Sequence, residues 1–374
     1  MKKTKTLLSL LLVLLLVLSA GCSNGSPQEP VDVPESGADA DSSSAKDSED
    51  STVKFTDSVG REVEIPADIE RIAPSGPLAQ VVLYTLCPDK LVGLASDLSD
   101  TQFEYIDSKY KSLPVFGNFY ADTLNLEAVM SANPQVVIDI GEAKATVNED
   151  MQGVQDKTGI PSIFINMELD TMAEAYRTLG KVVGEEEQAE KLAKYVENTL
   201  AEAKEKSASI PEESKVKVYY GQGNAGLTAV VRGTVHSDVI DAVGAINVAD
   251  SQENIRGGAS DISMEQLMLW QPDAVLLAPG SIYDDVDSRA EWQEINAIKN
   301  KKYYEIPEGP YNWMGRPPSV NRIIGIKWLG NLLYPDIYQY DMDKETKEFY
   351  KLFYHCDVTD EQINKLLENS THKY

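Results

Sequence analysis

A 14-residue segment that occurs twice constrains the fold of this chain more than any other feature. Residues 125–138 read NLEAVMSANPQVVI and residues 263–276 read SMEQLMLWQPDAVL, at a constant offset of 138 positions. Both segments have the pattern of a capping residue, a short helix, a proline and a buried strand. Four of the 14 positions are identical, and the other apolar positions mostly match in kind. The repeat predicts two similar lobes with a cleft between them, where small ligands usually bind.

Short apolar strands alternate with helical segments on both sides of one long stretch without proline. Residues 171–207 are rich in Ala, Leu, Glu and Lys, with apolar residues near helical spacing, so they predict one long helix. Pro211 ends that helix, and a second series of strands and helices begins near residue 216. This alternation is typical of α/β proteins. We therefore expect an α/β fold of two Rossmann-like lobes that a single long helix joins, with the ligand cleft between the lobes.

The expected boundaries follow from the same pattern. Apolar strand segments flank a predicted hairpin turn at 57–60, so the folded part is expected to begin near residue 53. The expected parts are an N-terminal lobe at 53–168, a connecting helix at 169–210, a C-terminal lobe at 211–335, and helices at 336–374 that pack on the second lobe.

The first 22 residues are predicted to be a lipoprotein signal peptide. Three lysines precede an apolar run at 7–19, which is too short for the roughly 20 residues of a membrane-spanning helix and ends at Ala20, Gly21 and Cys22. Small residues before a cysteine resemble the lipobox of bacterial lipoproteins, in which cleavage leaves that cysteine N-terminal and diacylated. Cys22 is therefore the expected lipidation site. The alternative is a plain signal peptide in which Cys22 is incidental.

Residues 23–52 are predicted to form a disordered acidic tether, because they contain Ser, Gly, Pro, Asp and Glu and almost no apolar residue. The whole chain has 34 basic against 60 acidic residues, a formal charge of −26. A field of that sign repels phosphate backbones and anionic lipids, so nucleic-acid binding is excluded and the membrane is expected to be reached only through the lipid anchor. Three cysteines cannot form a disulfide scaffold, and Cys87 and Cys356 are expected to be unpaired.

Taken together, these features resemble a substrate-binding lipoprotein of an ABC importer, of the class that carries ferric siderophores, haem and cobalamin. The resemblance covers residues 53–328 and rests on the signal with its lipobox, the tether, the two lobes, the long helix and the paired motifs before a proline and a strand. The segment at 310–322, PYNWMGRPPSVNR, is similar to a branch assigned to iron complexes or other metal compounds, molybdate included.

The resemblance implies a receptor on the outer face of the bacterial cytoplasmic membrane. Such a receptor captures a metal complex, with a ferric siderophore or other iron chelate as the first expectation, and delivers it to a permease dimer with its cytoplasmic ATPase. Haem, cobalamin and an oxyanion such as molybdate remain alternative ligands. The resemblance implies no enzymatic activity and no cofactor, and a monomer is expected.

Glu127 and Glu265 occupy matching positions of the two repeated segments. If Asn125 and Ser263 cap their helices, each glutamate lies in the first turn, where a carboxylate favourably meets the helix dipole. That structural role is sufficient to explain both residues. In the resembled family, however, the glutamate of this motif in each lobe docks onto arginines of the permease, so the resemblance implies permease docking for both.

Loops that follow strands are expected to face the cleft. Ser75 and Gly76 precede a helix whose free backbone N–H groups can receive an anionic group. Arg232 and Arg316 offer planar forks for carboxylate, catecholate or oxyanion oxygens, although a loop arginine can equally be solvated or ion-paired. Aromatic rings can stack on a chelate or simply close the core. The predicted ligand-binding residues are Ser75, Gly76, Asn118, Tyr120, Arg232, Tyr311, Trp313 and Arg316.

Other functional classes fit less well. Residues 221–226 spell a dinucleotide-binding loop, but the β-branched sequence after them does not open a helix. The chain has three histidines, two of them near its C-terminal end, so direct binding of a bare transition metal is disfavoured and no metal site is expected. A secreted hydrolase is the alternative of another class, yet the chain has no Gly-x-Ser-x-Gly elbow. A surface adhesion or scaffold protein would not require two similar lobes around a cleft.

Overall fold

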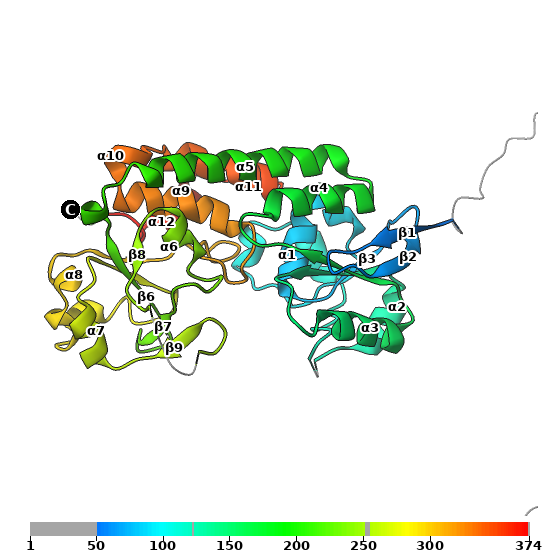
Figure 1. Cartoon of the computed structure of the whole chain (residues 1–374), viewed down its shortest axis with the longest axis horizontal. Coiled ribbons are helices and arrows are strands. Elements are labelled where there is room, and N and C mark those ends of the chain that lie inside the picture. Colours follow the sequence, from blue (N-terminus) through cyan, green and yellow to red (C-terminus); the bar gives the residue numbers. More distant parts are fainter. Residues whose placement is uncertain (1–50, 122, 251–254, 373–374) are drawn as a thin grey trace, which may run out of the picture. The chain divides into compact units, whose positions relative to one another are not determined.

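The computed structural model describes residues 51–121, 123–250 and 255–372 (Figure 1). The predicted signal peptide, Cys22 and residues 23–50 of the predicted tether lie outside the described residues. Within the described part of the chain, no helix has the length and apolar character that a membrane crossing requires.

The N-terminal lobe is built on a parallel three-stranded sheet and a hairpin. The sheet has the order β3 (Ile72–Pro74), β4 (Val136–Gly141), β5 (Ser162–Asn166), and the antiparallel hairpin consists of β1 (Thr52–Thr56) and β2 (Glu62–Pro66). Asp57 organises the hairpin turn, because one carboxylate oxygen accepts from the Val59 and Arg61 N–H groups at 3.1 and 2.9 Å. The main helices are α1 (Pro77–Leu86), α2 (Leu126–Ala132) and α3 (Val147–Thr158).

The C-terminal lobe contains a six-stranded mixed sheet. Its path is β11 (Tyr303–Glu305), β10 (Ala274–Leu277), β6 (Lys217–Gln222), β7 (Thr228–Val230) and β9 (Ala259–Asp261), and β8 (Ile246–Asn247) pairs with β6. The pairs of β10 with β11 and with β6 are parallel, whereas β7 is antiparallel to both of its neighbours. Its short helices are α6 (Asp238–Ala242), α7 (Met264–Trp270) and α8 (Asn296–Lys299).

The repeated segment marks equivalent positions of the two lobes, as predicted. α2 and β4 in one lobe correspond to α7 and β10 in the other, and each helix ends at a residue in the left-handed region, Asn133 with φ 50° and Gln271 with φ 41°. The hydrogen bonds made just before β4 and β10 also match. The Gln135 and Asp273 N–H groups donate to the carbonyls of Arg71 and Lys217, each at 2.8 Å.

The connection between the lobes differs from the prediction in one respect. Two helices, α4 (Met172–Val183) and α5 (Glu186–Ala208), occupy the range predicted to be one helix. The break lies at Gly184, whose φ of +70° ends α4 with a left-handed turn. α5 alone, with 23 residues, is the long helix that runs along both lobes (Figure 1).

The C-terminal helices contact both lobes. They are α9 (Asn321–Leu333), α10 (Pro335–Tyr338), α11 (Met342–Phe353) and α12 (Asp360–Leu367). α11 packs against α9 and also against α1 of the N-terminal lobe. On α12, Lys365 forms an ion pair with Glu104 of the N-terminal lobe at 3.1 Å. The prediction that the helices beyond residue 336 pack on the second lobe is therefore incomplete, because amphipathic spacing shows which face is buried but not what covers it.

Candidate functional site

A cavity of about 370 Å³ lies where the carboxyl ends of β3, β4 and β5 face the C-terminal lobe. The N-terminal lobe supplies most of its wall, and Val235, Pro318 and Arg322 close it from the other lobe. Four of the predicted ligand-binding residues, Ser75, Gly76, Asn118 and Tyr120, line this cavity. We call it the N-lobe cavity.

Ser75 and Asp139 meet at the base of the N-lobe cavity. Ser75 directly follows β3 and is fully buried, and its hydroxyl donates to Asp139 Oδ1 at 2.5 Å. Asp139 lies near the end of β4, so the parallel pairing of the two strands brings the side chains together. Burial raises the pKa of the Asp139 carboxyl, while the Ser75 hydroxyl and the Tyr120 hydroxyl act in the opposite direction. Asp139 was not among the predicted site residues, although an aspartate inside the apolar run VVIDI indicates a buried carboxyl group.

Gly76 and Asn118 shape the entrance to α1. Gly76 is the N-cap of α1 and supplies no side chain, so the first N–H groups of the helix remain open toward the N-lobe cavity. The Asn118 side-chain oxygen accepts from the Tyr120 N–H at 2.9 Å, and the Phe119 N–H donates to the Ser75 carbonyl at 2.9 Å. These bonds hold the loop at 117–121 beside the helix start.

Tyr120 reaches across the N-lobe cavity toward α3. Its hydroxyl lies 2.9 Å from Met151 Sδ, while 42% of the residue remains exposed. Burial of the hydroxyl and the neighbouring charge of Asp139 raise the pKa of Tyr120 well above its ordinary value. The side chain is therefore a neutral, partly exposed phenol on the cavity wall, which suits contact with a ligand.

Arg322 is the cation that the C-terminal lobe contributes to the N-lobe cavity. It lies at the start of α9, is 1% exposed, and pairs with Asp238 Oδ2 at 2.5 Å. Its Nε also donates to the Ser319 carbonyl at 3.3 Å. Burial lowers the pKa of Arg322, but the ordinary value is so high that the guanidinium stays charged. Arg322 was not among the predicted site residues, because an arginine at a helix start has no distinctive sequence pattern.

A wider hollow of about 980 Å³ adjoins the N-lobe cavity and shares Glu142, Lys144, Glu168 and Val235 with it. We call it the interlobe groove. His236 lines it and lies with Nδ1 2.7 Å from the Gly315 carbonyl, which fixes Nδ1 as the donor when the ring is neutral. Burial and the charge of Arg316 lower the pKa of His236.

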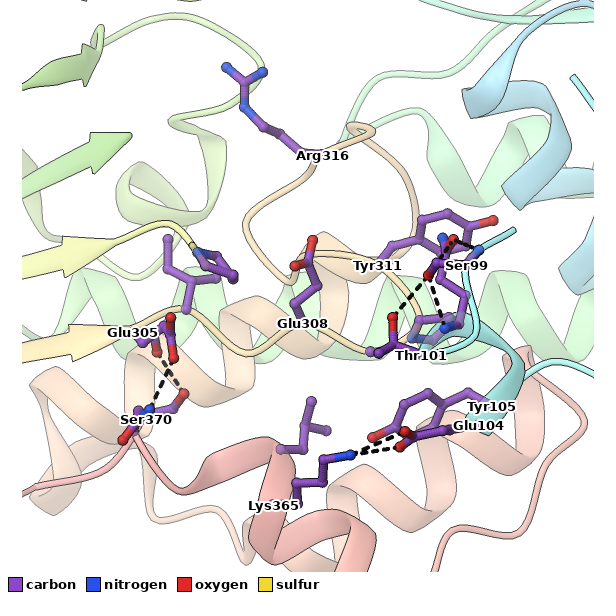
Figure 2. Close-up of a pocket in the computed structure, with 17 residues that line it drawn as sticks. Ser99, Thr101, Glu104, Tyr105, Glu305, Glu308, Tyr311, Arg316, Lys365 and Ser370 are labelled. Atoms are coloured by element: carbon purple, nitrogen blue, oxygen red, sulfur yellow. Dashed lines mark hydrogen bonds and ion pairs between the residues drawn. The ribbon is translucent and has the colours of Figure 1, made fainter. Parts of the chain in front are cut away.

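A third cavity, of about 480 Å³, contains two more of the predicted residues, Tyr311 and Arg316 (Figure 2). Its wall combines the loop at 99–105 with residues 305–316 and the end of α12. Glu308 lies between Arg316 and Tyr311 in the view of Figure 2. Arg316 is exposed and donates to the Gly257 carbonyl at 3.3 Å. The structure thus places the predicted residues in two separate cavities.

Two of the predicted ligand-binding residues line none of these three cavities. Arg232 is exposed, and its guanidinium donates to the Asn247 carbonyl. Trp313 is fully buried in the core and cannot stack on a ligand in this conformation. The reason is a close approach of the loop to α9, where a Cβ at Gly325 would lie 2.0 Å from the Trp313 carbonyl oxygen. The structure therefore corrects the prediction for Trp313.

Glu127 and Glu265 are exposed in the first turns of α2 and α7. The Asn125 side chain accepts from the Ala128 N–H at 3.0 Å, and the Ser263 hydroxyl accepts from the Gln266 N–H at 3.2 Å, so both residues are N-caps as expected. Bonds from its own backbone N–H and from Ser263 lower the pKa of Glu265. Large apolar side chains are exposed on the same helices, with Met130 at 54% and Leu269 at 79%.

The described residues contain no group of three or more His, Cys, Asp or Glu side chains placed to hold a metal ion.

Two α/β lobes, a long helix along both and cavities at the ends of the strands define a bilobed solute-binding protein. A family model described as periplasmic binding protein matches residues 89–310, and the chain belongs to that family.

Known proteins of this kind match most of the chain. An ABC transporter solute binding protein from Sulfurospirillum deleyianum has a TM-score of 0.77 and 30% identity, covering 84% of this chain and 99% of its own. The substrate-binding lipoprotein YvrC of Bacillus subtilis is 24% identical over 88% of this chain and 96% of its own length. The molybdate-binding protein MolA of Haemophilus influenzae is 20% identical over 80% of this chain and 90% of its own length.

The family and these relatives establish the general role of the chain. It is the substrate-binding component of an ABC transporter and not an enzyme. The expected α/β fold of two lobes is confirmed.

Proposed function

We propose that this protein captures a metal complex outside the cell, with an iron chelate as the first candidate, and delivers it to an ABC permease. The observation that carries the proposal is the N-lobe cavity, in which Ser75, Gly76, Asn118 and Tyr120 converge at the carboxyl ends of parallel strands and face the other lobe. Such edges are the usual ligand-binding positions of open α/β sheets. The volume of about 370 Å³ is also within the usual range for small-ligand sites.

The chemistry of the N-lobe cavity suits a chelate better than a bare ion. The open N–H groups at the start of α1 and the Asn118 amide can bond to ligand oxygens, and the Tyr120 ring can pack on a flat or apolar surface. The dispersed carboxylates of the described residues do not form a metal-ion site. These features support recognition of an organic shell around the metal.

Calorimetric titration tests the proposal on the full chain carrying Cys22→Ser, which prevents acylation. The panel contains ferric siderophores, haem, cobalamin, molybdate and free metal ions. We expect saturable binding of a metal complex at micromolar or tighter affinity, and we expect Tyr120→Ala to weaken it at least tenfold. Tyr340→Ala is the matched control, because Tyr340 is also a partly exposed tyrosine and lines none of the three cavities. No binding to any compound of the panel, with an equally flat thermal-shift screen, contradicts the proposal.

We also propose that Cys22 is acylated and holds the protein on the outer face of the cytoplasmic membrane. The Ala-Gly-Cys sequence and the lipoprotein relatives support this anchor. Cell fractionation of the wild type and of Cys22→Ser tests it. We expect the wild type in the membrane fraction and the variant to be released from it, and equal membrane retention of both would overturn the assignment.

A further inference from the structure

Carboxylates dominate the N-lobe cavity. Asp139, Glu142, Asp150 and Glu168 line it, against the two cations Lys144 and Arg322. Asp139 is half-buried at the base of the cavity, and Glu142 and Glu168 are exposed at the side shared with the interlobe groove. A ligand in this cavity therefore meets four acidic groups and two basic ones.

The more deeply placed cation is already neutralised within the protein. Arg322 is bound to Asp238 at 2.5 Å, and both side chains lie at the same interlobe surface. Lys144 is the other cation of the N-lobe cavity, and it is exposed. The positive charge available to an anionic ligand is therefore confined to one solvated ammonium group and the N-terminus of α1.

The interlobe groove is also lined mainly by acidic side chains. It adds Asp170 and Asp241 to the shared Glu142 and Glu168, and the cation in its wall is again Lys144. Asp238 also lines the groove, but its charge is balanced by Arg322. The two arginines that were expected to bind an anion line neither the N-lobe cavity nor the interlobe groove, although both lie beside the groove. Arg316 donates to the carbonyl of the groove residue Gly257, and the charge of Arg232 acts on the groove residue Asp241. Arg232 bonds to the Asn247 carbonyl, and Arg316 lines the third cavity together with Glu305 and Glu308.

Charges held around a cavity in a low-dielectric wall reinforce one another and select ligands by sign. No group of three of these carboxylates among the described residues is close enough to bind a metal ion directly. These carboxylates therefore do not coordinate a metal ion. Their combined negative field attracts or repels a ligand according to its net charge.

We propose that the cleft discriminates among metal complexes by net charge, with a cationic complex bound more tightly than a neutral one and an anionic complex bound most weakly. This inference rests on the proposed function, because it assigns the charge class of the ligand of that same site. Glu142 and Glu168 are the specificity-determining residues, since both face the N-lobe cavity and the interlobe groove.

The test uses ferric complexes that share the metal and differ in charge. A trihydroxamate complex with a free ammonium group carries +1, a ring-closed trihydroxamate complex is neutral, and a tris-catecholate complex carries −3. Molybdate adds a small dianion. Calorimetric titration of the full chain with Cys22→Ser at low salt should rank the affinities as +1 above 0 above −3, with about tenfold or more between the extremes.

Single-charge variants assign the discrimination to named residues. Glu142→Gln and Glu168→Gln should each lower the affinity for the +1 complex several-fold and reduce its dependence on salt. Lys144→Gln should raise that affinity. Glu174→Gln is the control, because Glu174 is an exposed carboxylate on α4 that lines none of the three cavities. This variant changes the net charge of the protein by the same amount.

The outcomes separate the inference from the proposed function. Tighter binding of the −3 complex or of molybdate overturns the charge inference and leaves import of a metal compound standing. Equal effects of Glu174→Gln and the two cavity variants overturn the assignment to Glu142 and Glu168. No binding of any metal compound overturns the proposed function, and the inference with it.

Discussion

Gly180 of α4 lies directly against Ala189 of α5, so close that a Cβ at Gly180 would be 2.4 Å from the Ala189 Cβ. Contacts of that length are not found between real side chains, so the two helices can pack at this distance only because residue 180 is glycine. Gly180 and Ala189 lie on either side of the turn at Gly184. Their close approach packs α4 against α5, the long helix that runs along both lobes.

Two helix-interior glycines should respond oppositely to alanine. Gly180→Ala forces α4 and α5 apart and should lower the free energy of unfolding by about 1–3 kcal/mol. Gly153→Ala on α3 should raise it by about 0.5–1 kcal/mol, since nothing lies within 4 Å of its Cβ position. Urea unfolding measures both, and a stabilised Gly180→Ala variant would show that the helices are not in contact there.

Ser75→Ala should destabilise the protein by about 1–3 kcal/mol, because Asp139 loses the hydroxyl that donates to it in a half-buried position. Thr146→Ala is a suitable control. It removes a similar hydroxyl–carboxylate bond, to Asp150 at 2.8 Å, but on the exposed surface, where we expect a change below about 0.5 kcal/mol. Equal changes in chemical denaturation for the two variants would contradict the role of burial.

Glu127→Lys and Glu265→Lys should reduce transport while leaving ligand affinity unchanged, because both side chains are exposed and neither lines any of the three cavities. The resemblance of their motifs to permease-docking glutamates motivates this proposal. Glu174→Lys is the matched control, because it also reverses one exposed charge. Whole-cell uptake of labelled ligand and calorimetry measure the two effects, and normal uptake by both variants would remove the docking assignment.

His236 should make the protein less stable in mild acid. Burial and Arg316 lower its pKa in the folded state, so the unfolded chain binds this proton more readily. The stabilisation from neutral His236 is fully present above the unfolded pKa of about 6.5 and is lost as the pH falls below it, by at most about 1.4 kcal/mol per pH unit. Unfolding at pH 7.5 and pH 5.5 should show a smaller loss for His236→Gln than for the wild type. An NMR titration that places its pKa above 6.5 would refute the argument.

The two described cysteines are unpaired, as expected from the sequence, and should differ in reactivity. Burial raises the pKa of the Cys87 thiol to about 12, and it also raises that of Cys356, which is half-buried. In the Cys22→Ser chain at pH 8, a disulfide reagent should label Cys356 first and Cys87 only after unfolding. Mass spectrometry of peptides identifies the labelled site, and faster labelling of Cys87 would contradict its burial.

Local sequence was sufficient to predict the repeated units. The capping residues Asn125 and Ser263, and the prolines before β4 and β10, act within a few residues of their own position. Their spacing therefore predicts each helix, its end and the following strand without knowledge of the rest of the chain. Ser75, Gly76, Asn118 and Tyr120, which were expected to face the cleft, line one cavity at the carboxyl ends of the parallel strands.

Tertiary contacts decided what local pattern could not express. The burial of Trp313 depends on its contact with Gly325, and the pairing of Arg322 depends on Asp238. The carboxylates around the N-lobe cavity come from the ends of two strands, β4 and β5, and from α3. The sequence by itself determined two α/β lobes, a connecting helical segment and the family to which they belong. Only the tertiary structure decided which side chains face the cleft and what charge they present there, because burial and electrostatic fields depend on distances between residues far apart in the chain.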